Sequence, residues 1–238
     1  MKEKNNWMTR YRWYHLVLSV FVTTLIVSNI IAVKVVAVLG LILPAAVILF
    51  PVAYIIGDVL TEVYGYGRAR QAIWIAFGCN LLAVAAIWIA GLLPPAPSWT
   101  VGVLNGPEEA TQAFQAILGF TPRLLLASFI AYLAGEFVNA FILAKMKILT
   151  QGRFLWTRTI GSTLIGQGID SLLFISVAFF GVLPTSILVS AILAQWLVKS
   201  AYEVLATPLT YLVVNALKRA ESFDVFDTNT NFNPLHVG

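Results

Sequence analysis

The sequence predicts an all-α, polytopic membrane protein with six transmembrane helices and with both termini in the cytoplasm. Hydrophobic residues make up 59% of the 238 residues and charged residues only 11%, whereas soluble domains carry about 25% charged residues. Apolar runs of roughly 20 residues recur along the chain, which is the length that a helix needs to cross a bilayer. Basic residues cluster at the N-terminus and after the second, fourth and sixth of these runs. The positive-inside rule places such clusters on the cytoplasmic side.

Six apolar segments are expected to cross the membrane in sequence. They cover residues 15–39, 43–64, 71–93, 122–148, 159–182 and 184–217. The first segment is too long for the core of a signal peptide. The last exceeds the length of one crossing, so we expect that it either breaks at Pro208 or projects into the cytoplasm.

The connecting segments carry the charges that orient the spans. Residues 94–121 contain prolines and the acidic pair Glu108 and Glu109, which is typical of an outside loop with a short surface helix. A basic cytoplasmic loop is expected around Lys145, Lys147, Arg153 and Arg158. A single six-span domain should therefore cover residues 1–219, and residues 220–238 should form a polar cytoplasmic tail.

Several classes of function are disfavoured by composition. The single cysteine, Cys79, excludes an intrachain disulfide, and the two histidines, His15 and His236, give no metal-ligand spacing. No phosphate-binding loop or nucleotide-binding motif is present, so no cofactor and no ATP-driven pumping by this chain alone are expected. The net charge of +4 does not indicate a nucleic-acid partner, because the basic residues lie at span ends.

The chain is organised around the stretch FPVAYIIGDVLTEVYGYGRAR, residues 50–70. Asp58 and Glu62 are four residues apart and so share one face of a helix, and a carboxylate inside a membrane is generally functional. Arg68 and Arg70 mark the cytoplasmic end of this span. We expect Asp58 to bind substrate and Glu62, Arg68 and Arg70 to serve in coupling or gating. Alternatively, Glu62 is interfacial and pairs with Arg68.

Strongly polar residues fall at one depth when each span is counted inward at about 1.5 Å per residue. They are Asn29, Asn80, Glu136, Asn139, Gln167, Asp170, Gln195 and Lys199, with Asp58 slightly closer to the cytoplasm. Each of these groups needs a partner or water inside the membrane. We expect a substrate site formed by Asp58, Glu136, Asn139, Gln167, Asp170, Gln195 and Lys199. The alternative is that the amides and hydroxyls, Asn80 in particular, only hold helices together.

A midplane pocket of carboxylates and amides suits a small, flat, hydrogen-bonding solute, so the sequence predicts a transporter of a polar or cationic small molecule. The aspartates Asp58 and Asp170 also suggest an intramembrane aspartyl protease. That family's Pro-Ala-Leu motif is absent, and its paired motifs are only partly matched. We therefore expect the chain not to be an enzyme.

The stretch at residues 50–70, the segment GSTLIGQGIDSLLF and the tail string FNPL resemble the queuosine precursor transporter family of six-span proteins. The resemblance covers nearly the whole chain after Ser28. It implies import of 7-deazaguanines such as preQ0 and preQ1 across the plasma (inner) membrane. Asp58, Glu62, Gln167 and Asp170 lie in the matching motifs, and the resemblance implies binding or coupling roles for them.

The resemblance does not decide how transport is energised or which precursor is preferred. Facilitated and proton-coupled transport both remain open. A different class of protein is the runner-up: a substrate-capturing membrane subunit that serves an ATP-driven, vitamin-type uptake system. The expected partners are the lipid bilayer and a small-molecule substrate, and homo-oligomer formation stays open.

Overall fold

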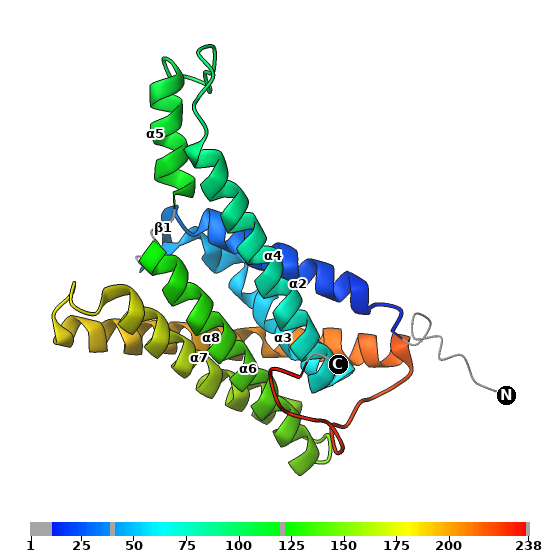
Figure 1. Cartoon of the computed structure of the whole chain (residues 1–238). Helices are drawn as coiled ribbons and strands as arrows, with labels where there is room; N and C mark the ends of the chain where they lie inside the picture. Colours follow the sequence, from blue (N-terminus) through cyan, green and yellow to red (C-terminus); the bar gives the residue numbers. More distant parts are fainter. Residues whose placement is uncertain (1–10, 39–40, 120–121, 237–238) are drawn as a thin grey trace.

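The computed structural model describes residues 11–38, 41–119 and 122–236 and consists mainly of helices, which confirms the all-α prediction (Figure 1). The helices are α2 (Tyr14–Ile31), α3 (Phe50–Tyr64), α4 (Tyr66–Leu92), α5 (Pro107–Leu118), α6 (Pro122–Leu149), α7 (Leu155–Phe179) and α8 (Thr185–Glu221). A short hairpin, β1 (Val35–Val38) and β2 (Leu41–Pro44), and a 3₁₀ turn, η1 (Ala45–Ile48), connect α2 to α3.

The surface of the bundle exposes many large apolar side chains, and its interior holds charged side chains beside an apolar core, which is unusual for a soluble protein. Leu82 and Trp88 on α4 are 71% and 63% exposed, whereas Asp58, Glu62 and Glu203 are at most 1% exposed. Five segments of the described chain are long and apolar enough to cross a membrane: α2, α4, the stretch that ends with α6, α7 and α8. The chain is therefore a multi-pass membrane protein. With only 15 residues, α3 is shorter than a complete span, so the count of six spans stays a prediction.

The first two expected spans are shorter than the sequence predicts. Helix α2 ends at Ile31 rather than near residue 39, and the antiparallel hairpin follows, with Val36 opposite Leu43 and Ala37 opposite Ile42. Valines are enriched in strands because their branched side chains fit a pleated surface. The hydropathy pattern could not reveal this change, because a strand and a helix of valines are equally apolar. Residues 39 and 40, where the first span was expected to end, lie outside the described residues.

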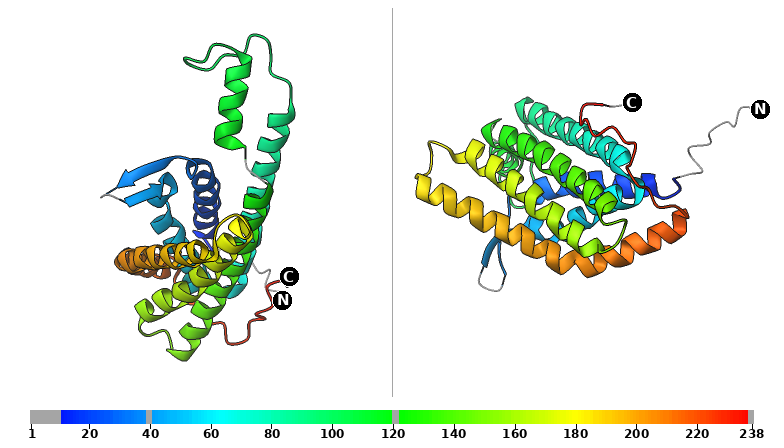
Figure 2. Two further views of the ribbon diagram at one scale, coloured as in Figure 1. Left: turned by 90° about the vertical axis from the view of Figure 1, so that its left-hand side faces the viewer. Right: turned by 90° about the horizontal axis from the view of Figure 1, so that it is seen from below.

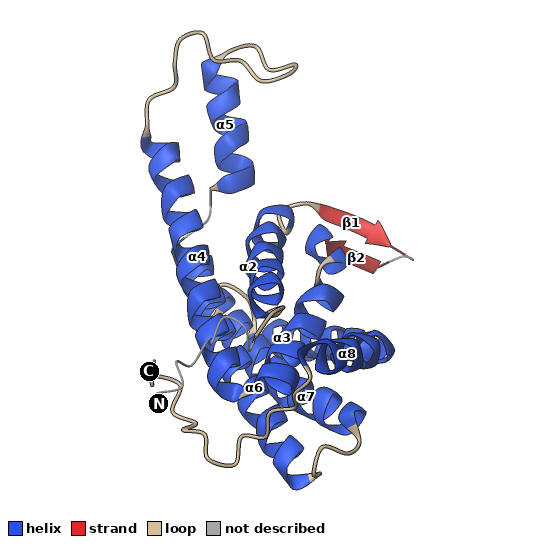
Figure 3. Ribbon diagram, turned by 90° about the vertical axis from the view of Figure 1, so that its right-hand side faces the viewer, coloured by secondary structure: helices blue, strands red, loops and turns tan. Residues whose placement is uncertain are grey.

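Gly65 alone joins α3 to α4, at φ +81°, a conformation that other residues rarely adopt. A Cβ atom at this position would also lie 2.6 Å from Cγ1 of Val225 in the C-terminal tail. Helix α4 therefore begins at Tyr66 instead of near residue 71. Figure 3 shows α3 inside the bundle, while α4 continues past the bundle with α5 beside its far end. The short surface helix expected in the outside loop is α5.

Helix α8 continues through Pro208, so the predicted break there is wrong. A proline inside a helix removes one backbone hydrogen bond. Packing of the preceding and following turns holds the helix together, since Ala206, Thr207 and Thr210 are buried. Figure 2 shows α8 as one long helix along the outside of the bundle.

Helices α6 and α7 approach each other closely at two glycines. A Cβ atom on Gly135 would lie 3.2 Å from the carbonyl oxygen of Gly166 and 2.9 Å from Cβ of Asp170. A Cβ atom on Gly166 would lie 3.0 Å from the carbonyl oxygen of Gly135. Small residues allow this approach in membrane helices. It places the polar stripes of α6 and α7 next to each other.

The C-terminal tail packs back against α4 (Figure 1). The backbone N–H of Tyr66 donates to Asp227, and the guanidinium of Arg70 donates to the carbonyls of Asn231 and Asn233 at 2.8 Å. The ring of Phe232 lies 4.9 Å from the Tyr66 ring, measured between centroids. The described part of the tail is therefore a docked segment, and its division from residues 1–219 as a separate unit stays a prediction.

Candidate functional site

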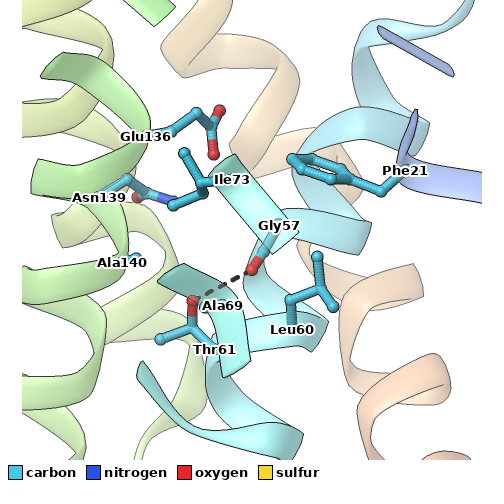
Figure 4. A pocket seen from close by; sticks show the side chains of 9 residues that line it. All are labelled: Phe21, Gly57, Leu60, Thr61, Ala69, Ile73, Glu136, Asn139 and Ala140. Carbon is cyan, nitrogen blue, oxygen red and sulfur yellow. Dashed lines mark hydrogen bonds between the residues drawn. The ribbon is translucent and has the colours of Figure 1, made fainter. Parts of the chain in front are cut away.

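A small cavity lies where α2, α3, α4 and α6 meet (Figure 4). Its volume is about 10 Å³, which is room for about one water molecule. Its lining consists of Phe21, Gly57, Leu60, Thr61, Ala69, Ile73, Glu136, Asn139 and Ala140. The Glu136 carboxylate reaches toward Gly57, where a Cβ atom would lie 3.6 Å from Oε2 of Glu136. A glycine at position 57 therefore makes room for this carboxylate beside α3.

Helices α3, α6, α7 and α8 carry buried polar atoms without a hydrogen-bond partner, and one of these atoms, on Asn139, belongs to a residue that lines the cavity. The atoms from α3, α6, α7 and α8 are Asp58 Oδ2, Asn139 Oδ1, Gln167 Oε1, Ser171 Oγ, Ser200 Oγ and both carboxylate oxygens of Glu203. An unpaired buried polar group costs about 1–3 kcal/mol, and native proteins contain few of them. Such a concentration of unpaired polar atoms is typical of a site that binds a polar ligand.

Asp58 and Asn139 connect the site across α3 and α6. The Asn139 Nδ2 donates to Asp58 Oδ1 over a long 3.5 Å, and the second carboxylate oxygen of Asp58 accepts no hydrogen bond. Among the charged side chains near Asp58, Glu203 on α8 has the strongest electrostatic interaction with it. The structure therefore brings Asp58, Asn139 and Glu203 into one buried group.

Asp170 and Lys199 form an ion pair between α7 and α8. Their side chains are 18% and 16% exposed, so the pair is half-buried. Gln195 is also half-buried, one helical turn before Lys199. On the opposite side of the bundle, Asn29 on α2 donates to Asn80 on α4 at 2.9 Å, which is the helix-to-helix contact expected of Asn80.

A second polar cluster surrounds Glu62 at the end of α3. Arg158 donates from Nε to Oε2 at 2.9 Å and from Nη2 to Oε1 at 2.7 Å, and Lys218 donates to Oε1 at 2.7 Å. Lys147 lies 3.6 Å from the same carboxylate and donates to the Glu62 carbonyl oxygen. The side chains of Glu62, Lys147 and Arg158 are at most 1% exposed. This Glu62 cluster therefore joins α3, α6, α7 and α8 at one end of the bundle.

A family model described as "Putative vitamin uptake transporter" matches residues 44–213, from the end of β2 to the last third of α8. The chain belongs to this family of vitamin uptake transporters. A curated relative, the "Probable queuosine precursor transporter" of Bacillus subtilis (strain 168), is 28% identical over 185 residues, covering 77% of this chain and 77% of the relative. No solved structure matches the chain. The match to a transporter family and not to an enzyme family rules against the protease interpretation.

In this member of the transporter family, most of the residues predicted for the substrate site come from neighbouring helices. Three helices, α3, α6 and α7, supply Asp58, Glu136, Asn139, Gln167 and Asp170, and α6 packs against both of the others. Lys199 reaches the group through its ion pair with Asp170, and among the described residues no hydrogen bond or ion pair joins Gln195 to it. Whether these residues bind substrate stays a prediction.

The three residues predicted for coupling or gating lie in different surroundings. Glu62 is the centre of its own cluster and does not pair with Arg68, contrary to the alternative interpretation. Arg68 donates to Gln71 and lies over the Tyr11 ring, 4.8 Å from its centroid. Arg70 binds the C-terminal tail. Neither arginine contacts Asp58 among the described interactions.

Sequence reasoning missed Glu203 as a site residue, and it assigned Lys147 and Arg158 to an exposed basic loop. The loop assignment is wrong, because α6 extends to Leu149 and α7 begins at Leu155, so both residues are helical and buried. The spacing of four between Lys199 and Glu203 on one apolar helix was the signal for Glu203. No comparable signal distinguishes Lys147 from its exposed neighbour Lys145.

Proposed function

We propose that this transporter imports queuosine precursors, 7-deazaguanines such as preQ0 and preQ1, across the plasma (inner) membrane. The observation that carries the proposal is the group of buried, unpartnered polar atoms contributed by α3, α6, α7 and α8. The name of the Bacillus subtilis relative and the resemblance of residues 50–70 to queuosine precursor transporters support this choice of substrate.

The residue types in the group match the edges of a guanine-like ring. Carboxylates accept hydrogen bonds, and Glu136 and Asp170 can receive the ring amide N–H and the exocyclic amine. The side-chain amides of Asn139 and Gln167 both donate and accept, so they can match either edge. Lys199 can donate to a ring carbonyl. Tyr132, which packs at the edge of the hydrophobic core, offers an aromatic face.

The cavity of about 10 Å³ is far smaller than the pockets of about 300 Å³ or more that hold small molecules. A deazapurine ring can therefore enter only when helices move apart. The ion pairs of the Glu62 cluster connect α3 to α6, α7 and α8. We therefore assign Glu62 a gating role at the cytoplasmic end. Opening toward the cytoplasm would require this cluster to separate.

A ligand-dependent shift in melting temperature of the purified protein tests the substrate class. A ligand that binds the native state raises the melting temperature. We expect preQ0 and preQ1 to stabilise the protein, and guanine, adenine, riboflavin and thiamine to do so weakly or not at all. Stabilisation by a vitamin together with no response to any 7-deazaguanine would contradict the proposal.

Substitution of Asp170 tests whether the polar group is the binding site. We expect Asp170→Asn to weaken 7-deazaguanine binding roughly tenfold or more, because a hydrogen bond to a buried charged group contributes about 1.5–3 kcal/mol. The exposed Glu108 on α5 provides a matched control, and Glu108→Gln should leave the affinity unchanged. Unchanged affinity in a folded Asp170→Asn variant would move the site elsewhere.

The runner-up, a substrate-capturing subunit of an ATP-driven uptake system, is favoured only by the family's vitamin description. Uptake by the purified chain in liposomes separates the two functions. Transport without any partner protein would exclude an obligatory subunit. Tight binding of a 7-deazaguanine without transport would favour the subunit.

A further inference from the structure

Asp58 on α3 and Glu203 on α8 form a buried carboxyl pair for which the substrate proposal gives no complete account. Each side chain is 1% exposed. Three of their four oxygens, Asp58 Oδ2 and both oxygens of Glu203, accept no hydrogen bond. The fourth receives only the long bond from Asn139, whose own Oδ1 is buried and unpartnered beside the pair. These oxygens can therefore accept hydrogen bonds from a further ligand.

Glu62 and Asp170 each form an ion pair with a cationic side chain, whereas Asp58 and Glu203 form none among the described residues. Glu62 is held by Arg158, Lys218 and Lys147. Asp170 is held by Lys199. No salt bridge within residues 11–38, 41–119 and 122–236 involves Asp58 or Glu203. An isolated carboxylate pair in a nonpolar environment is too costly to stay doubly ionised.

The side chains that face the pair add negative charge or are neutral. The carboxylates of Glu136 on α6 and Glu62 on α3 interact electrostatically with Asp58. Tyr54 on α3 interacts with both Glu203 and Tyr202 on α8. Asp170 on α7 belongs to the same neighbourhood, with its charge balanced by Lys199. Toward the adjoining cavity, α2 and α4 contribute only the apolar Phe21, Ala69 and Ile73.

A proton satisfies these constraints better than a metal ion does. One proton between two carboxyl groups supplies the missing donor and removes one charge, because a protonated carboxyl donates a hydrogen bond that a carboxylate can accept. A bound metal cation needs several oxygen ligands in a shell. The described part of the chain contains no group of three or more acidic, histidine or cysteine side chains that could hold one.

We propose that the Asp58–Glu203 pair is a proton-binding site that couples substrate uptake to the transmembrane proton gradient. This inference rests on the proposed import of 7-deazaguanines. The proton binds from the outside, where the gradient makes it abundant, and lowers the charge of the pair from −2 to −1 while the substrate occupies the neighbouring polar group. Release of both to the cytoplasm returns the pair to its costly doubly ionised form, which takes up the next proton.

Uptake of a radiolabelled 7-deazaguanine into liposomes containing the purified chain tests the proposal. One proton per substrate permits about tenfold accumulation for each pH unit of gradient, acid outside. We expect the wild type to accumulate substrate under this gradient, and Glu203→Gln to lose the response, since glutamine cannot exchange a proton. Glu108→Gln, on an exposed carboxylate, should respond as the wild type does.

The possible results separate the two proposals. If the Glu203→Gln variant accumulates substrate in response to the pH gradient like the wild type, the proton site lies elsewhere. If a sodium gradient alone drives accumulation, the coupling ion is sodium and not a proton. A wild type that binds 7-deazaguanine and equilibrates it regardless of the gradient would overturn the coupling and leave the substrate proposal standing. Absence of 7-deazaguanine binding would instead overturn the substrate proposal.

A measurement on the wild type covers the case in which Glu203→Gln does not fold. Calorimetric titration with preQ1 in buffers of different ionisation enthalpy reports the protons exchanged on binding. We expect net proton uptake that changes with pH, because substrate and proton occupy neighbouring sites. Binding with no proton exchange between pH 5.5 and pH 8 would contradict the proposal.

Discussion

Arg158 binds both carboxylate oxygens of Glu62, at 2.9 Å and 2.7 Å, although 96 residues separate the two in the chain. The same guanidinium donates to the backbone carbonyl of Arg153, so it also fixes the turn between α6 and α7. A two-bond arginine–carboxylate pair is directional as well as strong. Arg158 therefore sets the position of α3 relative to the α6–α7 hairpin, and with it the position of Asp58, one helical turn from Glu62.

Loss of the Glu62 charge should destabilise the fold strongly. Glu62→Gln leaves Arg158 buried without its counter-charge and leaves Lys147 with Asp224 alone. Removal of one partner from a buried ion pair typically costs about 3–5 kcal/mol. Unfolding in a denaturing detergent measures the change. Adding Arg158→Gln to this variant should cost less than the sum of the two single substitutions. An unfolding midpoint for Glu62→Gln equal to that of Glu108→Gln would show that the cluster contributes nothing to stability.

The close approach of α6 and α7 predicts that Gly166→Ala is harmful. The new methyl group would lie 2.8 Å from Cβ of Asn139 and 3.0 Å from the carbonyl oxygen of Gly135, so the helices must separate. Overpacking of this kind costs about 1–3 kcal/mol. It should also weaken ligand binding, because Asn139 and Gln167 flank the contact.

Gly78 on α4 is the matched control for this substitution. A Cβ atom there meets no heavy atom within 4 Å, and alanine favours a helix over glycine. Gly78→Ala should therefore leave the melting temperature unchanged or slightly higher. Equal melting temperatures for the two alanine variants would mean that the α6–α7 contact is looser than the structure shows.

The tail residue Asp224 should make part of the stability depend on pH. Burial raises the pKa of this carboxyl, but hydrogen bonds from Lys147 and Lys218 outweigh it and leave the pKa below the usual value of 3.8. A carboxyl whose folded pKa is depressed stabilises the native state above its unfolded pKa, and that contribution disappears as the pH falls through the folded pKa. Asp224→Asn should therefore melt below the wild type at pH 7.

The difference in melting temperature between wild type and Asp224→Asn gives the sign of this effect. We expect it to stay constant from pH 7 to pH 5 and to shrink below about pH 4. A maltoside detergent keeps the micelle uncharged over this range. A difference that grows on acidification would contradict the assignment of Asp224 to the Lys147 and Lys218 ion pairs.

The sequence correctly predicts those helices whose position depends on the length of an apolar segment. Helices α4, α6, α7 and α8 lie close to their expected ranges, because runs of apolar residues at the bilayer's length have one stable form. The hairpin at β1 and β2 was missed, because its valines are as apolar as a helix. Polar residues at a common depth predicted several members of the central group.

What sequence could not supply is the pairing between helices. Lys147 and Arg158 lie beside exposed basic residues in the chain, and only the closing of α6 onto α7 buries them. Glu203 lies four residues after Lys199 and so on the same face of α8, but its proximity to Asp58 depends on how α8 crosses α3. Partners of this kind follow from tertiary packing, which no single-helix pattern encodes.

The orientation of the chain in the membrane gives the last prediction. The backbone N–H groups of Arg12 and Trp13 donate to Glu221 at 3.0 Å and 2.8 Å, so the start of α2 and the end of α8 lie on one side. An even number of crossings must then separate them, which supports counting the short α3, with its preceding turn, as a crossing. Six spans place Arg12 and Gln151 inside and Asn105 outside. We expect a membrane-impermeant maleimide on intact cells to label Asn105→Cys only, in a Cys79→Ser background. Equal labelling of Arg12→Cys and Asn105→Cys would mean that α3 does not cross the membrane. Equal labelling of Asn105→Cys and Gln151→Cys would mean that α6 does not cross it.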